Sequence, residues 1–298
     1  MKLDIHGVIV AVLTPFTEGG RIDEKAFINH VDYLIKEGIN GIFIAGTTGL
    51  GPALSIDEKK RLIDLSSQFL GKGVHVIAHI TSLAIKESID LAKYASRREL
   101  TAVSITSPYF YKDVDETSIY EFIKNIAKES SIPVFIYNQP RYTGINIGVD
   151  LIRKLREKLN NIIGIKDSSG NIIHTLEFVQ ALGNELTILT GSDALFYPSL
   201  TIGAKGIVSA LANIIPRKFV ELYKKYLEGN YREALEIQKY IIKVRSILRK
   251  YSQLSAYYEA ARLLGLNVGY PRLPIRRLSH DELERLRVEL KKVGIVKT

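Results

Sequence analysis

Apolar residues occur in short runs along the chain, and amphipathic segments separate one run from the next. Most runs are continuously apolar rather than alternating, which is typical of parallel strands that are buried on both faces. We expect eight strands, at residues 7–15, 41–46, 74–80, 102–108, 133–138, 162–166, 186–191 and 206–211.

Helical patterns fill most of the gaps between these runs. In the first gap Phe27, Val31 and Leu34 recur at helical spacing, and Ser55 with Glu58 forms a capping box in the second. We expect helices at 23–37, 55–69, 86–97, 117–129, 150–159 and 173–182. Eight evenly spaced strand–helix units without a long crossover indicate an α/β fold of the (β/α)8 TIM barrel type, in preference to a doubly wound sheet.

Further helical patterns follow the last predicted strand. They lie at residues 218–228, 231–252, 256–264 and 281–292, and Ser279 with Glu282 makes a capping box for the last one. We therefore expect a barrel catalytic domain at 1–224 and a C-terminal helical extension at 225–298.

The charge of the chain is concentrated in that extension. The whole sequence carries a formal net charge of +9, yet residues 1–214 hold 22 basic and 23 acidic side chains, whereas residues 215–298 hold 19 and 9. Solvated helix faces are the ordinary explanation of such a bias. No zinc-finger, RNA-binding or basic-zipper pattern accompanies it, so nucleic acid is a minor alternative as a partner.

Composition excludes several other classes of site. The absence of cysteine excludes disulfides, thiolate metal sites and cysteine nucleophiles. The six histidines show no spacing with a third ligand, so we expect no metal and no other cofactor. The N-terminal apolar run is too short for a secretory signal or a membrane span, which leads us to expect a cytoplasmic protein without a membrane partner.

Candidate chemistry lies where the predicted strands end, because the active site of such a barrel is at the carboxyl ends of its strands. Lys166 follows four apolar or small residues at the end of the sixth run. Loss of hydration disfavours its ammonium, and a lysine with a lowered pKa can form a Schiff base with a carbonyl. The alternative is a structural lysine that reaches the rim or pairs with Asp167.

Two further strand ends carry groups that can transfer protons or bind a carboxylate. Tyr137 ends the fifth run, where its phenol can transfer protons, or can simply lie at the rim with its hydroxyl in water. Thr47 and Thr48 occupy a glycine-flanked turn whose backbone N–H groups and hydroxyls can hold a carboxylate. The alternative is a tight connection that requires glycine.

These strand ends together resemble one known family. The segments are Leu-Thr-Pro-Phe at 13–16, Gly-Thr-Thr-Gly at 46–49, Tyr-Asn-x-Pro at 137–140, Gly-Ile-Lys-Asp at 164–167 and Gly-Ser-Asp at 191–193. In this order they resemble the dihydrodipicolinate synthase / N-acetylneuraminate lyase family of pyruvate-dependent class I aldolases, from about residue 7 to residue 274.

The resemblance implies roles for individual residues. Lys166 would form the Schiff base with pyruvate, Tyr137 would transfer protons, and Thr47 would link Tyr137 into a proton relay. Thr48, with Gly49, would bind the pyruvate carboxylate. Ser168, Gly191, Asp193 and Ser209 would contact the hydroxyls of an aldehyde such as glyceraldehyde. The family also implies that no metal is needed and that the enzyme is a homotetramer.

Details within these segments favour one branch of the family. The sequence GTTGLG at 46–51 and the sequence GYPR at 269–272 resemble archaeal 2-keto-3-deoxygluconate aldolases. Dihydrodipicolinate synthases carry an arginine two residues after Tyr-Asn-x-Pro, where this chain has Tyr142, with Arg141 beside it. Phe110 stands where the family has a second relay tyrosine from the neighbouring subunit, so Tyr111 or Tyr109 would have to replace it, or the relay would be shorter.

We therefore expect a Schiff-base aldolase that cleaves a 2-keto-3-deoxy sugar acid to pyruvate and an aldehyde. The alternatives are 4-hydroxy-tetrahydrodipicolinate synthase, another lyase or dehydratase of the family, and a catalytically silent paralogue that binds a ligand or nucleic acid. The substrates would be small keto acids and aldehydes. The basic extension would then supply a positive field for anionic keto acids, with Arg249 the residue to test.

Overall fold

The computed structural model describes residues 4–296, and its strands form one closed parallel barrel in the order β1 to β8. The strands are β1 (Gly7–Ala11), β2 (Gly41–Ile44), β3 (His75–His79), β4 (Ala102–Thr106), β5 (Val134–Asn138), β6 (Ile162–Asp167), β7 (Thr187–Thr190) and β8 (Gly206–Ser209). The predicted (β/α)8 barrel is confirmed, and each of the eight predicted runs contains one strand.

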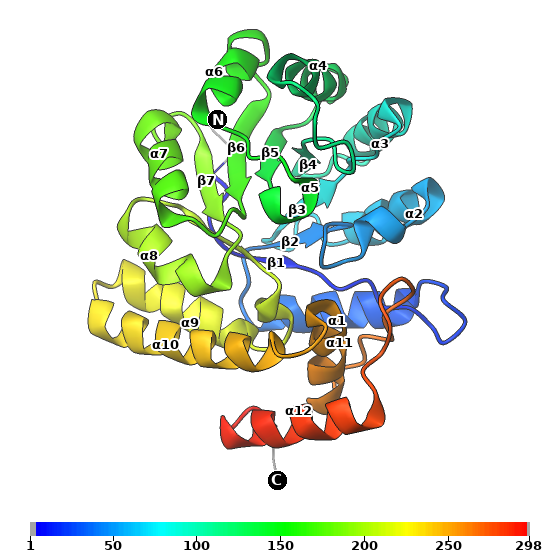
Figure 1. Cartoon of the computed structure of the whole chain (residues 1–298), viewed down its shortest axis with the longest axis vertical. Coiled ribbons are helices and arrows are strands. Elements are labelled where there is room, and N and C mark those ends of the chain that lie inside the picture. The colour runs from blue at the N-terminus through cyan, green and yellow to red at the C-terminus, as the bar shows by residue number, and fades with distance from the viewer. Residues whose placement is uncertain (1–3, 297–298) are drawn as a thin grey trace.

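Helices surround the barrel in a ring, as Figure 1 shows. They are α1 (Glu24–Lys36), α2 (Ile56–Ser67), α3 (Ile85–Arg97), α4 (Glu116–Ala127), α6 (Val149–Lys158), α7 (Ile172–Leu182), α8 (Phe196–Thr201) and α9 (Pro216–Leu227). The short helix α5 (Pro140–Thr143) and three single turns, η1 (Gly51–Ala53), η2 (Asp193–Leu195) and η3 (Leu211–Asn213), lie in the loops. The capping box of Ser55 and Glu58 begins α2 as predicted.

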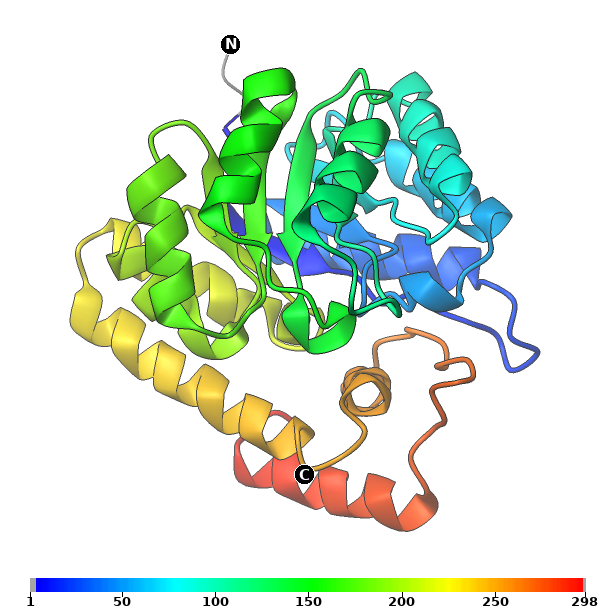
Figure 2. The same ribbon diagram turned by 45° about the horizontal axis from the view of Figure 1, so that its top comes forward.

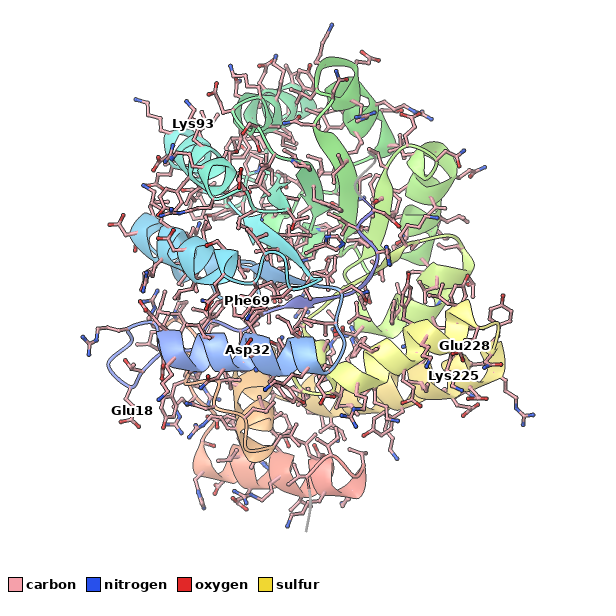
Figure 3. All side chains as sticks on the ribbon, turned by 180° about the vertical axis from the view of Figure 1, so that it is seen from behind. Glu18, Asp32, Phe69, Lys93, Lys225 and Glu228 are labelled. Atoms are coloured by element: carbon pink, nitrogen blue, oxygen red, sulfur yellow. The ribbon has the colours of Figure 1, made fainter. Side chains whose placement is uncertain are left out.

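Burial on both faces explains why the strands read as continuous apolar runs. In β1, Val8 and Val10 pack between the barrel and the helices, whereas Ile9 and Ala11 point into the barrel interior. The interior cluster also includes Phe43 of β2. On the outer side charged side chains such as those of Asp32 and Lys93 point away from the barrel (Figure 3).

Three helices follow the ring and cover the mouth of the barrel. They are α10 (Tyr231–Leu248), α11 (Gln253–Leu263) and α12 (His280–Lys292), and Figure 2 shows them below the strands, with α5 facing α11. The helix predicted for 231–252 ends at Leu248, and α11 begins three residues earlier than expected. The predicted domain boundary after residue 224 falls inside α9, which packs against β1; a separate unit at 225–298 stays a prediction.

Arg272 joins the C-terminal segment to the barrel loops. Its guanidinium donates to the Ala53 carbonyl at 2.5 Å and to the Gly20 carbonyl at 3.0 Å, and it forms an ion pair with Glu58. It also lies over the ring of Phe16, 4.4 Å from the centroid. These contacts connect the chain beyond α11 with the loop that follows β2.

Many basic residues of the C-terminal helices form ion pairs with acidic neighbours. Lys225 pairs with Glu233, and Arg276 pairs with Glu282. This agrees with solvated helix faces as the explanation of the charge bias. None of the helices within residues 4–296 combines the length and the apolar character that a membrane crossing requires.

The seam between β1 and β8 gives a test of barrel closure. Gly206 pairs with Gly7, and a Cβ atom on Gly206 would lie 2.1 Å from the Gly7 carbonyl oxygen. We expect Gly206→Ala to lower the free energy of unfolding in urea by about 2–3 kcal/mol, because the strands would have to separate. Gly19→Ala, in an exposed loop with open space around it, is the control and should change it by less than about 0.5 kcal/mol. Equal stabilities for the two variants would contradict this description of the seam.

Candidate active site

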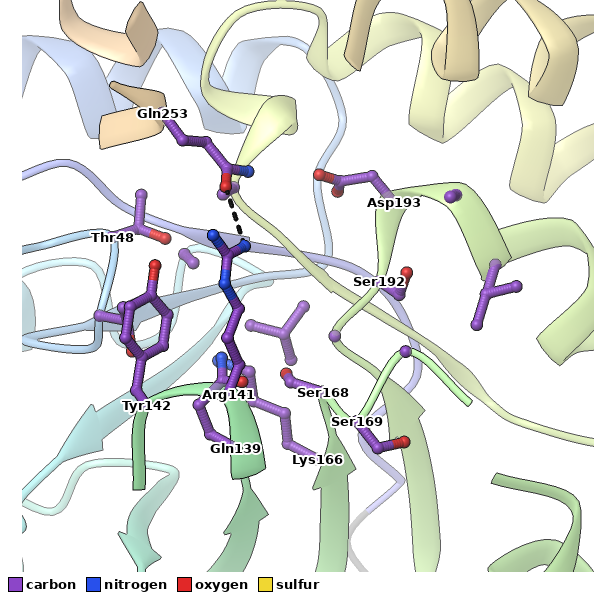
Figure 4. Close-up of a pocket in the computed structure, with 18 of the residues that line it drawn as sticks. Thr48, Gln139, Arg141, Tyr142, Lys166, Ser168, Ser169, Ser192, Asp193 and Gln253 are labelled. Atoms are coloured by element: carbon purple, nitrogen blue, oxygen red, sulfur yellow. Dashed lines mark hydrogen bonds between the residues drawn. The ribbon is translucent and has the colours of Figure 1, made fainter. Parts of the chain in front are cut away.

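A cavity of about 360 Å³ lies at the carboxyl ends of the strands, between the barrel and helices α10 and α11 (Figure 4). It brings together most of the residues that the sequence singled out. Those that line it are Thr47, Thr48, Tyr137, Lys166, Ser168, Gly191 and Asp193.

Lys166 is the buried amine that lines this cavity. Its side chain is only 4% exposed, and its Nζ lies 3.8 Å from the ring centroids of both Phe43 and Tyr137. Burial lowers the pKa of the Lys166 ammonium, and the neighbouring Tyr137 and Asp193 oppose that shift. The lowered pKa favours the neutral amine, which is the nucleophile in Schiff-base formation.

Asp167 does not serve as the partner of Lys166. Successive side chains of a strand point to opposite faces, and the Asp167 carboxylate accepts hydrogen bonds from Asn138 at 3.0 Å and from Thr175 at 2.7 Å. No ion pair joins Lys166 to Asp167 or to any other acid within residues 4–296 at 4.0 Å or less. The structural alternative for Lys166 therefore has no support.

Tyr137 lies beside Lys166 with its hydroxyl in a hydrogen-bonded position. Gln139 donates to the Tyr137 hydroxyl at 3.0 Å, and the Thr47 hydroxyl lies 3.4 Å from it. Burial alone would raise the pKa of Tyr137, but the charge of Lys166 and the hydrogen bonds of its neighbours bring it below the ordinary value. A phenol with a lowered pKa next to an amine is suited to proton transfer at neutral pH.

The turn after β2 presents Thr47 and Thr48 to the cavity, but Gly49 has a different place. The Gly49 carbonyl accepts a hydrogen bond from the Thr14 hydroxyl at 2.7 Å, and the turn is closed by a bond from the Gly51 N–H to the Gly46 carbonyl. Gly49 does not line the cavity. Its contact holds the turn against the loop that follows β1.

Asp193 is a buried acid on the opposite wall. The Ser209 hydroxyl donates to Asp193 Oδ1 at 2.6 Å, so Ser209 acts through Asp193 rather than lining the cavity itself. Burial raises the pKa of the Asp193 carboxyl to about 6, although Ser209 and Arg245 act in the opposite direction. Beside it, a Cβ on Gly191 would lie 1.8 Å from Ser168 Oγ, so only glycine leaves the Ser168 hydroxyl in place.

Tyr111 lies outside this cavity. It is 58% exposed, and its ring packs edge-on against Phe110, which is 76% exposed and has a positive φ of 83°. Tyr109 instead lines a neighbouring cavity of about 280 Å³, together with Tyr137 and His79. Within the described chain Tyr111 does not line the cavity around Lys166, so its expected role toward a neighbouring subunit stays a prediction.

Several residues of the site were not anticipated from the sequence. Phe43 contacts Lys166, Gln139 holds the Tyr137 hydroxyl, and His79 lies 5.6 Å from the Tyr137 ring centroid, with its pKa lowered to about 3 by burial. Phe43 and His79 are strand residues that point into the barrel. Side chains alternate between the two faces of a strand, so the alternation along β2 and β3 could have indicated both residues. At the end of α10 the sequence pointed only to Arg249, and Arg245 gave no signal, because only the tertiary structure brings α10 to the mouth.

The arrangement defines a class of protein. A buried amine, a hydrogen-bonded phenol beside it and a turn with two threonine hydroxyls, at the mouth of a (β/α)8 barrel, are groups that a Schiff-base enzyme acting on keto acids requires. Within residues 4–296 there is no cluster of three or more histidine, aspartate and glutamate side chains able to hold a metal.

Comparison with known proteins identifies the family. The model of the Dihydrodipicolinate synthetase family matches residues 4–293. The 4-hydroxy-tetrahydrodipicolinate synthase of Bartonella bacilliformis is 34% identical, with 98% of this chain and 99% of that protein covered. The 2-dehydro-3-deoxy-phosphogluconate/2-dehydro-3-deoxy-6-phosphogalactonate aldolase of Sulfurisphaera tokodaii is 35% identical, with 96% of each covered.

Solved structures agree with this match. A variant of the Sulfolobus solfataricus 2-keto-3-deoxygluconate aldolase superposes with a TM-score of 0.91 at 30% identity, over 98% of this chain and 100% of that one. The chain therefore belongs to the dihydrodipicolinate synthetase family, and it is an enzyme of that family's pyruvate-dependent lyase and synthase type.

The buried carboxyl of Asp193 predicts a pH-dependent stability. Its pKa is about 6 in the folded protein and about 3.9 in an unfolded chain. The free energy of unfolding therefore falls as the pH rises from about 4 to above 6, because the carboxyl ionises less readily in the folded state. Below about pH 4 the carboxyl is protonated in both states and this effect disappears. We expect Asp193→Asn to raise the free energy of unfolding by about 3 kcal/mol at pH 8 and by almost nothing at pH 4.

Urea unfolding at pH 4, 6 and 8 measures this difference. Asp113→Asn, at an exposed loop position, is the matched control and should change stability by less than about 0.5 kcal/mol at every pH. A gain for Asp193→Asn that stays the same from pH 4 to pH 8 would show that ionisation of this carboxyl is not its source.

Proposed function

We propose that the enzyme is a class I aldolase that reversibly cleaves a 2-keto-3-deoxy sugar acid, of the 2-keto-3-deoxygluconate type, to pyruvate and an aldehyde. The observation that carries this proposal is the position of the Lys166 amine, 3.8 Å from the ring centroid of Tyr137, whose hydroxyl lies 3.4 Å from Thr47. The proposed nucleophile Lys166, the proton carrier Tyr137 and the relay residue Thr47 thus lie next to one another in the cavity.

The reaction follows from these groups. The neutral amine of Lys166 adds to the C2 carbonyl of the keto acid. A proton from the Tyr137 hydroxyl then lets the carbinolamine lose water, which leaves an iminium and a Tyr137 phenolate. The Tyr137 oxygen takes the proton of the C4 hydroxyl, the bond between C3 and C4 breaks, and its electron pair moves to the iminium nitrogen. The aldehyde leaves, a proton from Tyr137 adds to C3 of the enamine, and water releases pyruvate and restores Lys166.

The opposite wall of the cavity supports a hydroxylated aldehyde. Ser168 presents its hydroxyl over Gly191, and Asp193, held by Ser209, is able to accept hydrogen bonds from sugar hydroxyls. Tyr142 lines the cavity at the position where the family's synthases place an arginine, and a phenol cannot pair with the carboxylate of aspartate semialdehyde.

A second candidate function has one observation in its favour. Arg141, the neighbour of Tyr142, lines the cavity with its guanidinium, which supports 4-hydroxy-tetrahydrodipicolinate synthase as the alternative.

The adjacent and exposed rings of Phe110 and Tyr111 support a contact between copies, and we propose a homotetramer. We also propose the cytoplasm as the location.

Borohydride trapping tests the Schiff base. Pyruvate and borohydride should reduce the imine irreversibly onto Lys166, identified by mass spectrometry of the peptide, and Lys166→Arg should abolish the adduct. Lys59, also buried and with its pKa lowered to about 8 by burial, is an internal control that should stay unmodified. Tyr137→Phe should still be trapped, but its cleavage rate should fall by about 10²- to 10⁴-fold. An adduct that persists in Lys166→Arg would refute the assignment.

A comparison of two reactions tests the substrate. We expect cleavage of 2-keto-3-deoxygluconate to proceed with a larger kcat/KM than condensation of pyruvate with aspartate semialdehyde. Tyr142→Arg, which adds a carboxylate partner at an exposed position of the cavity, should raise the semialdehyde reaction relative to cleavage by about 10-fold. A large advantage of the wild-type enzyme for the semialdehyde would replace the proposed function by the alternative.

A further inference from the structure

The Tyr137 hydroxyl has two hydrogen-bonding partners from its own chain. The Gln139 amide nitrogen donates to the phenol oxygen at 3.0 Å, and Thr47 Oγ1 lies 3.4 Å from the same oxygen. All three residues line both the active-site cavity and the neighbouring cavity of about 280 Å³. Gln139 and Thr47 therefore lie where Tyr137 would exchange a proton with a bound keto acid.

The start of α5 fixes the backbone around Gln139. Gln139 precedes Pro140, the first residue of α5, and residues before proline have a restricted backbone. The Gln139 carbonyl accepts hydrogen bonds from the N–H groups of Tyr142 and Thr143 and from the Thr143 hydroxyl, each at 3.1 Å. The amide thus reaches the Tyr137 hydroxyl from a constrained turn, two residues after Tyr137 itself.

The two partners of Tyr137 differ in their chemistry. An amide NH₂ group donates hydrogen bonds and does not accept them, so the contact with Gln139 stabilises a phenolate but cannot carry a proton away. A threonine hydroxyl both donates and accepts. Thr47 is half-buried and lines both cavities, so its hydroxyl can exchange a proton with solvent. A proton relay from Tyr137 can therefore run through Thr47, while Gln139 acts on the charge of the phenol oxygen.

The other titratable groups that face Tyr137 do not replace Gln139 as a donor. Lys166 of β6 is the amine of the proposed Schiff base. His79 of β3 meets the phenol ring edge-on, and burial lowers the pKa of its imidazole to about 3, so it is neutral at physiological pH. Tyr109 and Tyr142 line the neighbouring cavity, but within residues 4–296 neither forms a hydrogen bond with the Tyr137 hydroxyl.

A role in packing alone does not explain the contact. Glutamine side chains are mostly exposed to water, whereas this amide is directed at a phenol that is only 3% exposed. Burial raises the pKa of Tyr137, and the charge of Lys166 and the hydrogen bonds of Thr47, Gln139 and Ser168 lower it. A buried phenolate has lost its water, so it depends on such donors from the protein.

We propose that Gln139 is a positioning residue that completes the relay within one chain: its amide holds the Tyr137 oxygen and stabilises the negative charge that forms there whenever Tyr137 gives up a proton. A phenol oxygen can accept two hydrogen bonds, so one position is left for the C4 hydroxyl of the substrate. The missing hydroxyl of Phe110 then needs no replacement by Tyr111. The inference rests on the proposed function for the identity of the proton that Tyr137 accepts.

The pH dependence of carbon–carbon cleavage tests this role. Once the iminium has formed, Tyr137 must be a phenolate to take the C4 proton, so the single-turnover rate should fall as the pH is lowered and Tyr137 becomes protonated. Loss of a donor raises the pKa of a phenol, so Gln139→Leu should move this acidic limb to higher pH by about one unit. Gln139→Glu, whose carboxylate repels the phenolate, should move it at least as far.

Controls locate the effect. Gln180→Leu makes the same change at an exposed position of α7 and should leave the limb where it is. Trapping of pyruvate on Lys166 in each variant shows that the site is intact. A loss of rate in Gln139→Leu that is equal at every pH, or a limb that moves to lower pH, would overturn the inference. So would a shift that appears in Tyr111→Phe and not in Gln139→Leu, because the second hydrogen bond would then come from a neighbouring copy.

A titration of the enzyme without substrate separates this inference from the proposed function. Tyrosine isotope-labelled at Cζ reports the ionisation of each phenol by NMR, and Tyr137→Phe identifies the signal of Tyr137. Gln139→Leu should raise the pH at which this signal titrates by about one unit. A signal that does not move would refute the inference even if 2-keto-3-deoxygluconate is cleaved. A signal that moves in an enzyme that cleaves no keto-deoxy acid would keep the role of Gln139 and refute the proposed reaction.

Discussion

The burial of one amine is the constraint on which the rest of this site depends. Lys166 comes from a strand that is buried on both faces, and its Nζ lies between the rings of Phe43 and Tyr137 with no acid in contact. Loss of hydration makes the ammonium unfavourable, while the aromatic faces and the Tyr137 oxygen limit that cost. Burial by the barrel therefore favours the neutral amine, and the proximity of Lys166 lowers the pKa of Tyr137, whereas Tyr137 acts against the shift of Lys166.

Closure of the barrel supplies that environment. Pairing of β8 with β1 removes the sheet edges and brings the carboxyl ends of all eight strands to one mouth, where Thr47, Tyr137 and Asp193 meet Lys166. The C-terminal helices then complete the cavity. Arg272 ties the segment beyond α11 to the loop after β2, so the extension has two roles: it supports the Thr47–Thr48 turn from outside, and it adds α10 and α11 to the wall.

Sequence reasoning reached the strands and most of the chemistry for identifiable reasons. Continuous apolar runs are a direct consequence of burial on both faces, and Lys166 is conspicuous because it ends such a run. The ends of the helices were predicted less accurately. The helix predicted to reach residue 252 ends at Leu248, and the sequence did not show this end because helix-forming residues lie on both sides of it. Gly49 was expected to bind the substrate, but its carbonyl accepts from Thr14 and it does not line the cavity. The role of Tyr111 toward a neighbouring subunit stays a prediction.

The sequence by itself determined the order of strands and helices and the barrel class, and it pointed to Lys166 as the candidate nucleophile, because these follow from local periodicity and from residues next to one another in the chain. Only the tertiary structure decided which groups surround the nucleophile. Phe43, Gln139 and Arg245 lie far apart in sequence and become neighbours through barrel closure and the packing of α10 over the mouth. Desolvation and electrostatic coupling depend on distances in space. The sequence could therefore suggest a lowered pKa for Lys166, but only the folded chain shows which groups oppose that shift and which shift Tyr137 and Asp193.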